Sequence, residues 1–286
     1  AAGALILFLR FAEDMPLRVA LWYGIFHSVS AFSNAGFDLQ GSYRSLIGYD
    51  ESWVINLTIM ALIQAGALSY VFFADIVEKR RWRGLALETR IILIMNLLML
   101  FVGAAIFLGA EWNNTLSDVP YAERPLVAMF QSVAARTAGF ASVNFGAVTN
   151  IVLFSWVAIM FVGGASGSTA GGVKLTTVGV VALAVVSTVR GQMEPQVFGR
   201  RIPTLLIFRA MAVIAIMFLA HFVSTLALTI SQQLSGGDAS FLALLFESMS
   251  ALATVGLTTG ITPFLSDAAK LVLAATMFFG RIGPLT

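Results

Sequence analysis

Three copies of a short motif place small or hydroxyl-bearing residues directly before a glycine. The copies are FHSVSAFSNAGF at residues 26–37, FQSVAARTAGF at 130–140 and FESMSALATVGL at 246–257. Glycine tolerates positive φ, so the backbone can turn its carbonyl groups toward a common axis. Rings of backbone carbonyls can replace the water oxygens of a cation without any fixed charge. The residues that we predict to form such a cation filter are Ser33, Asn34, Ala35, Gly36, Thr137, Ala138, Gly139, Thr254, Val255 and Gly256.

The composition indicates the kind of protein that must position these motifs. Hydrophobic residues make up 58% of the 286 residues, charged residues only 11%, and the mean hydropathy is +0.88. Such a chain is too apolar for a soluble domain. The runs Trp53–Ala74, Ile91–Ala110 and Ala210–Gly237 each approach or exceed the roughly 20 residues that a membrane-spanning helix needs. We therefore predict an all-α membrane protein, in contact with lipid. The net charge of +2 does not indicate a nucleic-acid-binding surface.

Each motif copy lies between two long hydrophobic segments. The repeated segment is too short to cross a membrane and return as two helices. It fits a half-helix that dips in from outside, followed by an extended stretch that climbs back out. Irregular backbone at that depth survives only where it lines water or is buried in protein. We therefore expect repeated helix–pore helix–helix modules, with each glycine at a pore. Tight turns that only pack are the alternative, and it accounts less well for three related copies.

A glycine-rich loop, residues 163–173, interrupts another membrane-spanning segment. The sequence GGASGSTAGGVKLTT begins at Gly163 and separates two half-helices, residues 149–162 and 174–189. A flexible loop just inside the filter can obstruct the path of an ion. A phosphate-binding loop is excluded because Val173 intervenes before Lys174, whereas close helix packing through GxxxG spacings stays open. The predicted gate residues in this region are Gly163, Gly164, Ser166, Gly167, Ser168, Thr169, Gly171, Gly172 and Lys174.

Arg281 is predicted to act with this loop. An arginine deep in a hydrophobic segment costs at least roughly 2.5–3.5 kcal/mol, so its side chain should face the protein interior. Gly139 lies 24 residues before Gly163, and Gly256 lies 25 before Arg281. The two sites are therefore level in equivalent modules. We expect the guanidinium to bond loop carbonyls or hydroxyls, such as those of Ser166 or Ser168, and to form an electrostatic barrier. A snorkelling arginine at the membrane interface is the alternative.

Two charged residues within the motif copies carry further expectations. Arg136 immediately precedes a filter motif and is expected to brace it by bonding neighbouring carbonyls. Glu247 is expected early in a pore helix, where an acid complements the positive helix end.

The chain resembles a family of K⁺ transporters. The segments SAFSNAGFDL, ARTAGFASV, ATVGLTTG and above all GGASGSTAGGVK are similar to the superfamily of KtrB, TrkH and plant HKT proteins, with KtrB-type members the most similar. The resemblance implies four modules arranged pseudo-fourfold around a central K⁺ pore, in a homodimer on a cytosolic nucleotide-binding RCK ring of the KtrA or TrkA type. Only three motifs occur here, so we expect a fragment that lacks the first module and the end of the last. Modules two, three and four would then comprise residues 1–80, 81–195 and 196–286.

The orientation follows from the basic residues. Nine of the 17 lysines and arginines fall in two connections, residues 79–90 and 190–209, which the positive-inside rule assigns to the cytoplasm. We expect a multi-pass protein of the cell membrane.

The function classes narrow accordingly. No HExxH or GxSxG motif and no paired intramembrane carboxylates indicate an enzyme. The sequence predicts channel-like uptake of K⁺, with Na⁺ as a second candidate ion and with nucleotide acting only through the regulatory partner. A tightly coupled secondary cation symporter stays open, although such folds favour inverted repeats, and these modules all carry the pore segment in one sense.

Overall fold

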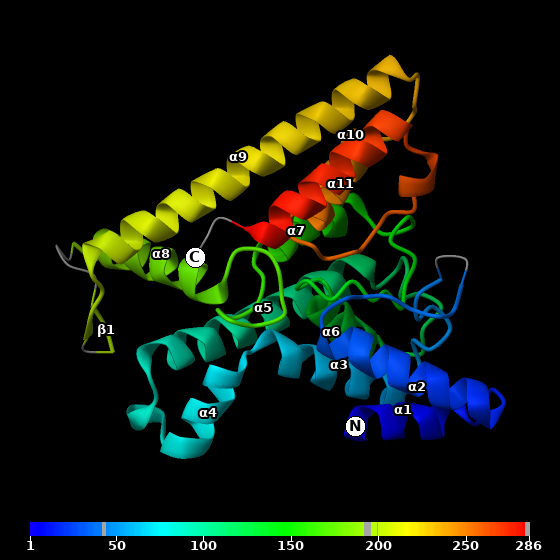
Figure 1. Ribbon diagram of the computed structural model, residues 1–286, viewed down its shortest axis with the longest axis horizontal. Helices are drawn as coiled ribbons and strands as arrows, with labels where there is room; N and C mark the ends of the chain where they lie inside the picture. Colours follow the sequence, from blue (N-terminus) through cyan, green and yellow to red (C-terminus); the bar gives the residue numbers. More distant parts are fainter. Residues whose placement is uncertain (42–43, 192–195, 199, 284–286) are drawn as a thin grey trace.

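The computed structural model describes residues 1–41, 44–191, 196–198 and 200–283. In these residues the chain is helical apart from one short hairpin (Figure 1). The all-α prediction is therefore confirmed. The elements are α1 Ala2–Phe11, α2 Leu17–Phe32, α3 Trp53–Ala67, α4 Tyr70–Lys79, η1 Trp82–Gly84, α5 Leu87–Glu111, α6 Arg124–Ala134, α7 Asn150–Phe161, α8 Leu175–Val189, β1 Gln196–Val197, β2 Arg200–Arg201, α9 Thr204–Leu234, α10 Phe241–Leu252, η2 Thr262–Phe264 and α11 Asp267–Ile282.

The same order of elements repeats along the chain. A helix is followed by a short helix that ends just before a glycine motif, and then by a further helix or a pair of half-helices. The short helices, α2, α6 and α10, have 16, 11 and 12 residues. None of the three meets the roughly 20 residues of a spanning helix. The predicted helix–pore helix–helix order is therefore present in the described chain.

Within the described ranges, two helices are long and apolar enough to cross a membrane, α5 with 25 residues and α9 with 31. The predicted span Trp53–Ala74 is not one helix, because α3 ends at Ala67 and α4 departs at 92°. The break lies at Ser69, whose φ is 67° and whose hydroxyl accepts from Phe72 N as the cap of α4. A non-glycine residue in the left-handed region cannot continue a helix. The end of α3 at Ala67 determines where the glycine-rich loop can bond.

Aromatic side chains join the long helix α5 and the third pore helix, α10, to the half-helix α7. The Trp156 ring lies 5.3 Å from that of Phe107 and 6.5 Å from that of Phe145. The Phe145 ring lies 5.8 Å from that of Phe246 on α10. All four side chains are buried. Large buried rings stabilise a core through area and edge contacts, so this column fixes α7 and α10 against each other.

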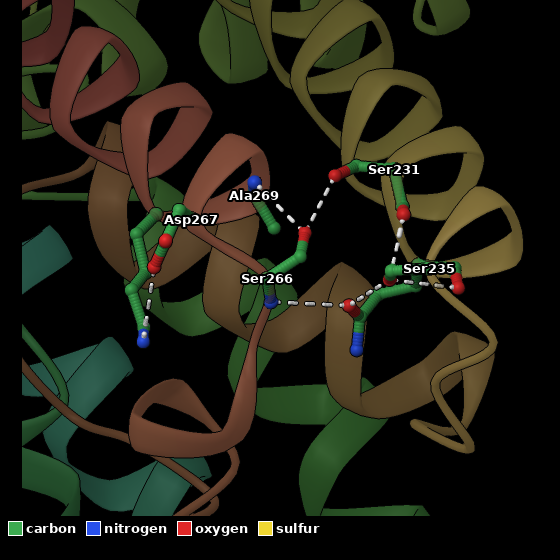
Figure 2. Close-up of polar contacts among 7 residues, drawn as sticks. Ser231, Ser235, Ser266, Asp267 and Ala269 are labelled. Carbon is green, nitrogen blue, oxygen red and sulfur yellow. Dashed lines mark hydrogen bonds and ion pairs between the residues drawn. The ribbon is translucent and has the colours of Figure 1, made fainter.

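A polar cluster sets the register of α11 against α9. Ser266 caps α11 by accepting from Ala269 N at 3.2 Å, and its hydroxyl lies 2.8 Å from that of Ser231 on α9. Figure 2 shows both contacts. Ser266 N also donates to Gln232 Oε1 on α9 at 3.5 Å. The cap stabilises the first turn, and the link to α9 fixes how far along the membrane axis α11 extends. The height of Arg281 near the other end of α11 follows from it.

The two basic connections differ in how much of them is described. Residues 79–90 are described throughout. In the connection 190–209, residues 192–195 and 199 lie outside the described residues, and β1 pairs antiparallel with β2, with Gln196 opposite Arg201. The sequence GRIGPLT is described as far as Gly283.

Candidate ion-binding site and adjoining loop

The three motif glycines converge on one another. A Cβ placed on Gly36 would lie 2.4 Å from the carbonyl oxygen of Ala138. One on Gly139 would lie 2.2 Å from the carbonyl oxygen of Val255 and 3.3 Å from the Cα of Gly256. Segments more than a hundred residues apart therefore meet at backbone contact distance. Only glycine permits this approach, since any side chain would collide with the neighbouring carbonyl.

The backbone of each motif alternates between left-handed and ordinary conformations. Asn34, Thr137 and Thr254, each two residues before the glycine, have φ of 52°, 66° and 53°, and the motif glycines have φ between 71° and 95°. Ala35, Ala138 and Val255 each lie between one of these left-handed residues and the motif glycine, and their φ is negative. Such alternation turns successive carbonyls to one side of a segment, whereas in a regular strand they alternate. The arrangement suits a column of oxygen ligands.

Serines of the pore helices hold two of these segments from behind. Ser30 Oγ donates to Phe37 O at 2.7 Å, and Ser250 Oγ donates to Leu257 O at 2.6 Å. Gly256 N donates to Ser250 Oγ at 3.2 Å. The two serines occupy equivalent places in their motifs. Each fixes the carbonyl just after the motif glycine, which limits collapse of the segment. The repetition of this serine in two motifs could have indicated its role from the sequence, but we did not predict that role.

Glu247 has a different role from the one predicted. It is the seventh residue of α10 and lies in mid-helix, where the positive helix end is not felt. Its carboxylate instead accepts from Thr258 Oγ1 at 2.7 Å, from Thr259 N at 2.8 Å and from Thr262 Oγ1 at 2.9 Å. A buried carboxylate is stable when its oxygens are satisfied in this way. Glu247 therefore anchors the stretch that follows the third filter motif.

Arg136 also differs from its prediction. Its guanidinium is buried and donates through Nη1 to the side-chain oxygen of Asn96 on α5. We expected neighbouring carbonyls as acceptors, but the side chain leaves the motif and reaches the preceding long helix. A buried arginine needs an acceptor wherever one lies within reach. Arg136 thus ties the second motif to α5.

Several polar atoms at the motifs have no partner in the described chain. Among the predicted filter residues they are Asn34 Nδ2, Thr137 Oγ1 and Thr254 Oγ1, and the second motif adds Gln131 Oε1 and Arg136 Nε. Buried polar atoms without a partner are uncommon and call for an explanation. Two hydroxyl oxygens beside converging carbonyls fit oxygen coordination of a large cation. The Ser33 hydroxyl is not part of this group, because it donates to Val29 O within the end of its own helix.

The glycine-rich loop is pinned at both ends. Gly163 N donates to Val173 O at 2.9 Å, Val173 N to Phe161 O at 3.0 Å, and Leu175 N to Gly164 O at 2.9 Å. The predicted half-helices on either side are α7 and α8, so this interruption of the span is confirmed. The loop enters and leaves at one point (Figure 1). Its order comes from hydrogen bonds, although its sequence suggested flexibility.

The loop docks on the end of α3. Ala165 N donates to Ala67 O at 2.8 Å, and Thr169 N donates to Gly66 O at 3.3 Å. The last carbonyls of a helix have no partner within it. Because α3 breaks where it does, these carbonyls are available at the depth of the loop. The break that we did not predict therefore supplies the acceptors for the loop.

One face of the loop adjoins the third filter motif. A Cβ on Gly171 would lie 2.1 Å from Thr254 Oγ1 and 2.5 Å from Ala253 O. The tip, with Ser166 and Gly167, is exposed. The loop thus has a buried part against the motif and a free tip, and glycine at position 171 is required by the close approach.

Arg281 contacts the loop as predicted, with a different acceptor. Its Nη1 donates to Thr169 O at 3.1 Å in place of Ser166 or Ser168. Lys174 Nζ donates to Ala170 O at 2.7 Å. Both cations line a cavity of about 340 Å³, together with Ser168, and no carboxylate is among its described lining residues. A cavity lined by one sign of charge repels ions of that sign.

Two glycines after the motifs, Gly66 and Gly280, occupy equivalent places in the structure, and neither was predicted to have a role. A Cβ on Gly66 would lie 1.8 Å from Phe32 O, and one on Gly280 would lie 1.8 Å from Leu252 O. In both modules the second helix packs on the end of the pore helix through a glycine. Gly280 follows Gly256 by the same number of residues as Gly163 follows Gly139, and this equal spacing could have identified Gly280 from the sequence.

Comparisons with known proteins agree with this architecture. The family model TrkH, described as a cation transport protein, matches residues 1–286. The Ktr system potassium uptake protein B of Bacillus subtilis is 36% identical over 99% of this chain and 63% of its own. The potassium/sodium uptake protein NtpJ of Enterococcus hirae is 34% identical over 99% of this chain and 62% of its own. The crystal structure of the potassium transporter TrkH from Vibrio parahaemolyticus superposes with a TM-score of 0.74 at 21% identity, over 98% of this chain and 59% of that one.

Repeated pore helices, each followed by a glycine turn, define a class of membrane transport proteins. The chain belongs to the TrkH family of cation transport proteins, which confirms the predicted family. The named relatives are transporters, as the expectation that the chain is not an enzyme requires. The chain spans less than two thirds of the length of these relatives.

Proposed function

We propose that this chain is the ion-conducting part of a K⁺ uptake transporter. The observation that carries the proposal is the convergence of three glycine segments, whose left-handed backbone places carbonyls of one segment against the glycine of the next. Carbonyl oxygens that replace a hydration shell select a large monovalent cation. The names of the relatives, which refer to potassium, support K⁺ as the ion, and the name of NtpJ supports Na⁺ as a second one.

The loop and its two cations form the gate of this proposed path. The loop lies against the third motif and is held by α3 on one side and by Arg281 on another. Lys174 and Arg281 add positive charge beside it, which raises the energy of a passing K⁺. Opening then requires the loop to leave Arg281 and the motif together. Packing alone, the other role considered for the glycines, does not account for the paired cations.

The assembly is also part of the proposal. Three motifs leave a fourfold arrangement open, and the greater length of the relatives supports a further module in the whole protein. Residues 1–80, 81–195 and 196–286 serve as modules two to four. The whole protein is a homodimer in the cell membrane, with connections 79–90 and 190–209 in the cytoplasm beside an RCK ring. The name "Ktr system" of a relative supports a partner subunit.

Reconstitution tests the function. The full-length protein is placed in liposomes with a K⁺ gradient, and the reversal potential is measured in K⁺ and Na⁺ solutions. Channel-like conduction predicts a reversal potential that follows the K⁺ gradient. A potential that shifts with the Na⁺ or H⁺ gradient at constant K⁺ would instead establish the coupled symporter. Absence of K⁺ movement would contradict both.

A further inference from the structure

Thr169 joins the glycine-rich loop to the first of the three filter motifs. Its hydroxyl lies 3.3 Å from Phe32 O, at the end of α2, and 3.4 Å from Asn34 Oδ1. Phe32 and Asn34 are 137 and 135 residues away in the sequence. Among the loop residues predicted for the gate, Thr169 is the one whose side chain hydrogen-bonds a predicted filter residue in the described part of the chain. The side chain therefore links the loop directly to the filter.

The backbone of Thr169 is engaged on two further sides. Its N–H donates to Gly66 O, and its carbonyl accepts from Arg281. One residue thus contacts a pore helix, a filter segment, the end of α3 and the last helix, α11. The bonds are 3.1–3.4 Å long, and all except the one from Arg281 are longer than the usual range, so they are weak. Each can break without a large cost, which suits a contact that opens and closes.

Asn34 is the filter residue most dependent on this contact. It is buried and holds φ of 52°, a conformation that persists only where the surroundings enforce it. The bond from Thr169 is the one hydrogen bond that its side chain makes in the described chain, since Asn34 Nδ2 has no partner there. Loss of the Thr169 hydroxyl would leave the side chain of Asn34 without a hydrogen bond to any described residue.

We propose that Thr169 couples the gate loop to the filter, so that displacement of the loop changes ion selection as well as flux. This inference rests on the proposed function. The hydrogen-bonded coupling is confined to the first motif, whereas the third motif meets the loop through the packing of Gly171. Thr137 and Thr254 occupy the position of Asn34 in the second and third motifs, and their hydroxyls have no hydrogen-bond partner among the described residues. A moving loop would therefore release the first motif more than the other two.

The test compares three variants of the full-length protein in liposomes. Thr169→Val keeps the shape and removes the hydroxyl, and Thr169→Ser keeps the hydroxyl. Thr229→Val is the matched control, because that hydroxyl bonds only Thr225 O within α9. Thr169→Val should lower the K⁺ over Na⁺ permeability ratio about fivefold, the factor that corresponds to one net hydrogen bond. Thr169→Ser and Thr229→Val should retain the wild-type ratio.

An Asn34→Ala background shows whether the effect passes through Asn34. There, Thr169→Val should cause no further change in the permeability ratio, whereas an undiminished change would overturn the coupling. A flux increase in Thr169→Val with an unchanged ratio would also overturn it, since the loop would then only block the path.

A second measurement does not depend on transport. The concentrations of K⁺ and Na⁺ that half-maximally protect the purified protein against thermal unfolding report ion binding directly. Their ratio should shift in Thr169→Val in the same direction as permeability, and no shift would contradict the proposal. If wild-type protein neither moves K⁺ nor is stabilised by it, the proposed function fails as well. If the wild-type protein is selective for K⁺ and Thr169→Val has the same selectivity, only the coupling is overturned.

Discussion

The motif glycines differ in how tightly they are confined, and this gives a graded prediction. Gly139→Ala would force a Cβ to within 2.2 Å of Val255 O, whereas Gly256→Ala meets nothing nearer than 3.8 Å. Both substitutions add the strain of a left-handed alanine, of order 1–3 kcal/mol. We expect Gly139→Ala to reduce K⁺ over Na⁺ discrimination at least about tenfold and Gly256→Ala to have a smaller effect. Uptake of both ions by a K⁺-uptake-deficient strain measures this, and equal losses would argue against the ring geometry.

The charge of Arg281 gives a second prediction at the scale of one residue. Arg281→Gln should raise K⁺ flux, because it removes a cation from the cavity and weakens the hold on Thr169 O. A change of about 1–2 kcal/mol in the barrier corresponds to about 5- to 30-fold. Lys270→Gln is the control, since it removes the same charge from the exposed start of α11, where its pair with Asp267 contributes little. Equal K⁺ flux in Arg281→Gln and Lys270→Gln would contradict the proposal that Arg281 forms a barrier.

The contact of Arg281 with the loop was predictable because chemistry left few choices. A buried arginine must find acceptors, so the contact of Arg281 with the loop followed from repeat spacing. The acceptor could not be chosen, because Ser166 lies at the exposed tip and only the folded loop shows this. Glu247 and Arg136 were misassigned for one reason. Their partners lie in separate segments, and sequence neighbours say nothing of those.

At the scale of elements, the loop can be displaced by one methyl group. Gly171→Ala places a Cβ 2.1 Å from Thr254 Oγ1, so the loop must move away from the filter motif. Overpacking of this kind costs about 1–3 kcal/mol, and we expect K⁺ flux to rise about tenfold. Gly109→Ala is the matched control, because a Cβ there meets nothing within 4 Å. Flux that falls in Gly171→Ala while the protein stays folded would contradict a gate.

Combining the two changes tests whether loop and arginine act together. Gly171→Ala with Arg281→Gln should raise K⁺ flux little beyond either single change, since each releases the same contact. Flux is measured in the same liposomes. Independent barriers would instead multiply the two effects.

The elements were largely predictable, and the exception has a physical cause. Long uncharged runs and the repeated motifs were sufficient to predict α5, α9 and the three short helices. The break between α3 and α4 was missed because residues 53–74 are uncharged and mostly apolar, and hydropathy does not register a left-handed residue. Ser69 adopts that conformation only in its tertiary setting. The loop's order was underestimated for the same reason, since its acceptors on α3 appear only once α3 has ended.

For the whole molecule, bound ions should stabilise the fold. A ligand that binds only the folded state adds about 2.7 kcal/mol at 100 times its Kd. We expect the Tm of the full-length protein to rise with K⁺ concentration, to rise less with Na⁺ and not at all with choline. Differential scanning fluorimetry at constant ionic strength measures this. A Tm that depends only on ionic strength would argue against a K⁺ site.

The seat of the loop on α3 bears on how the protein is made. The ribosome delivers Gly66 and Ala67 about 100 residues before the loop, which at 5–20 residues per second is a lead of several seconds. The nascent loop therefore meets a finished template as it enters the membrane. Arg281 follows Thr169 by 112 residues and emerges last of the three contacts. Until α11 inserts, the growing chain holds a loop that is docked on α3 but lacks its bond to Arg281, so under the proposed function a chain stalled before α11 would lack one of the two cations of the gate.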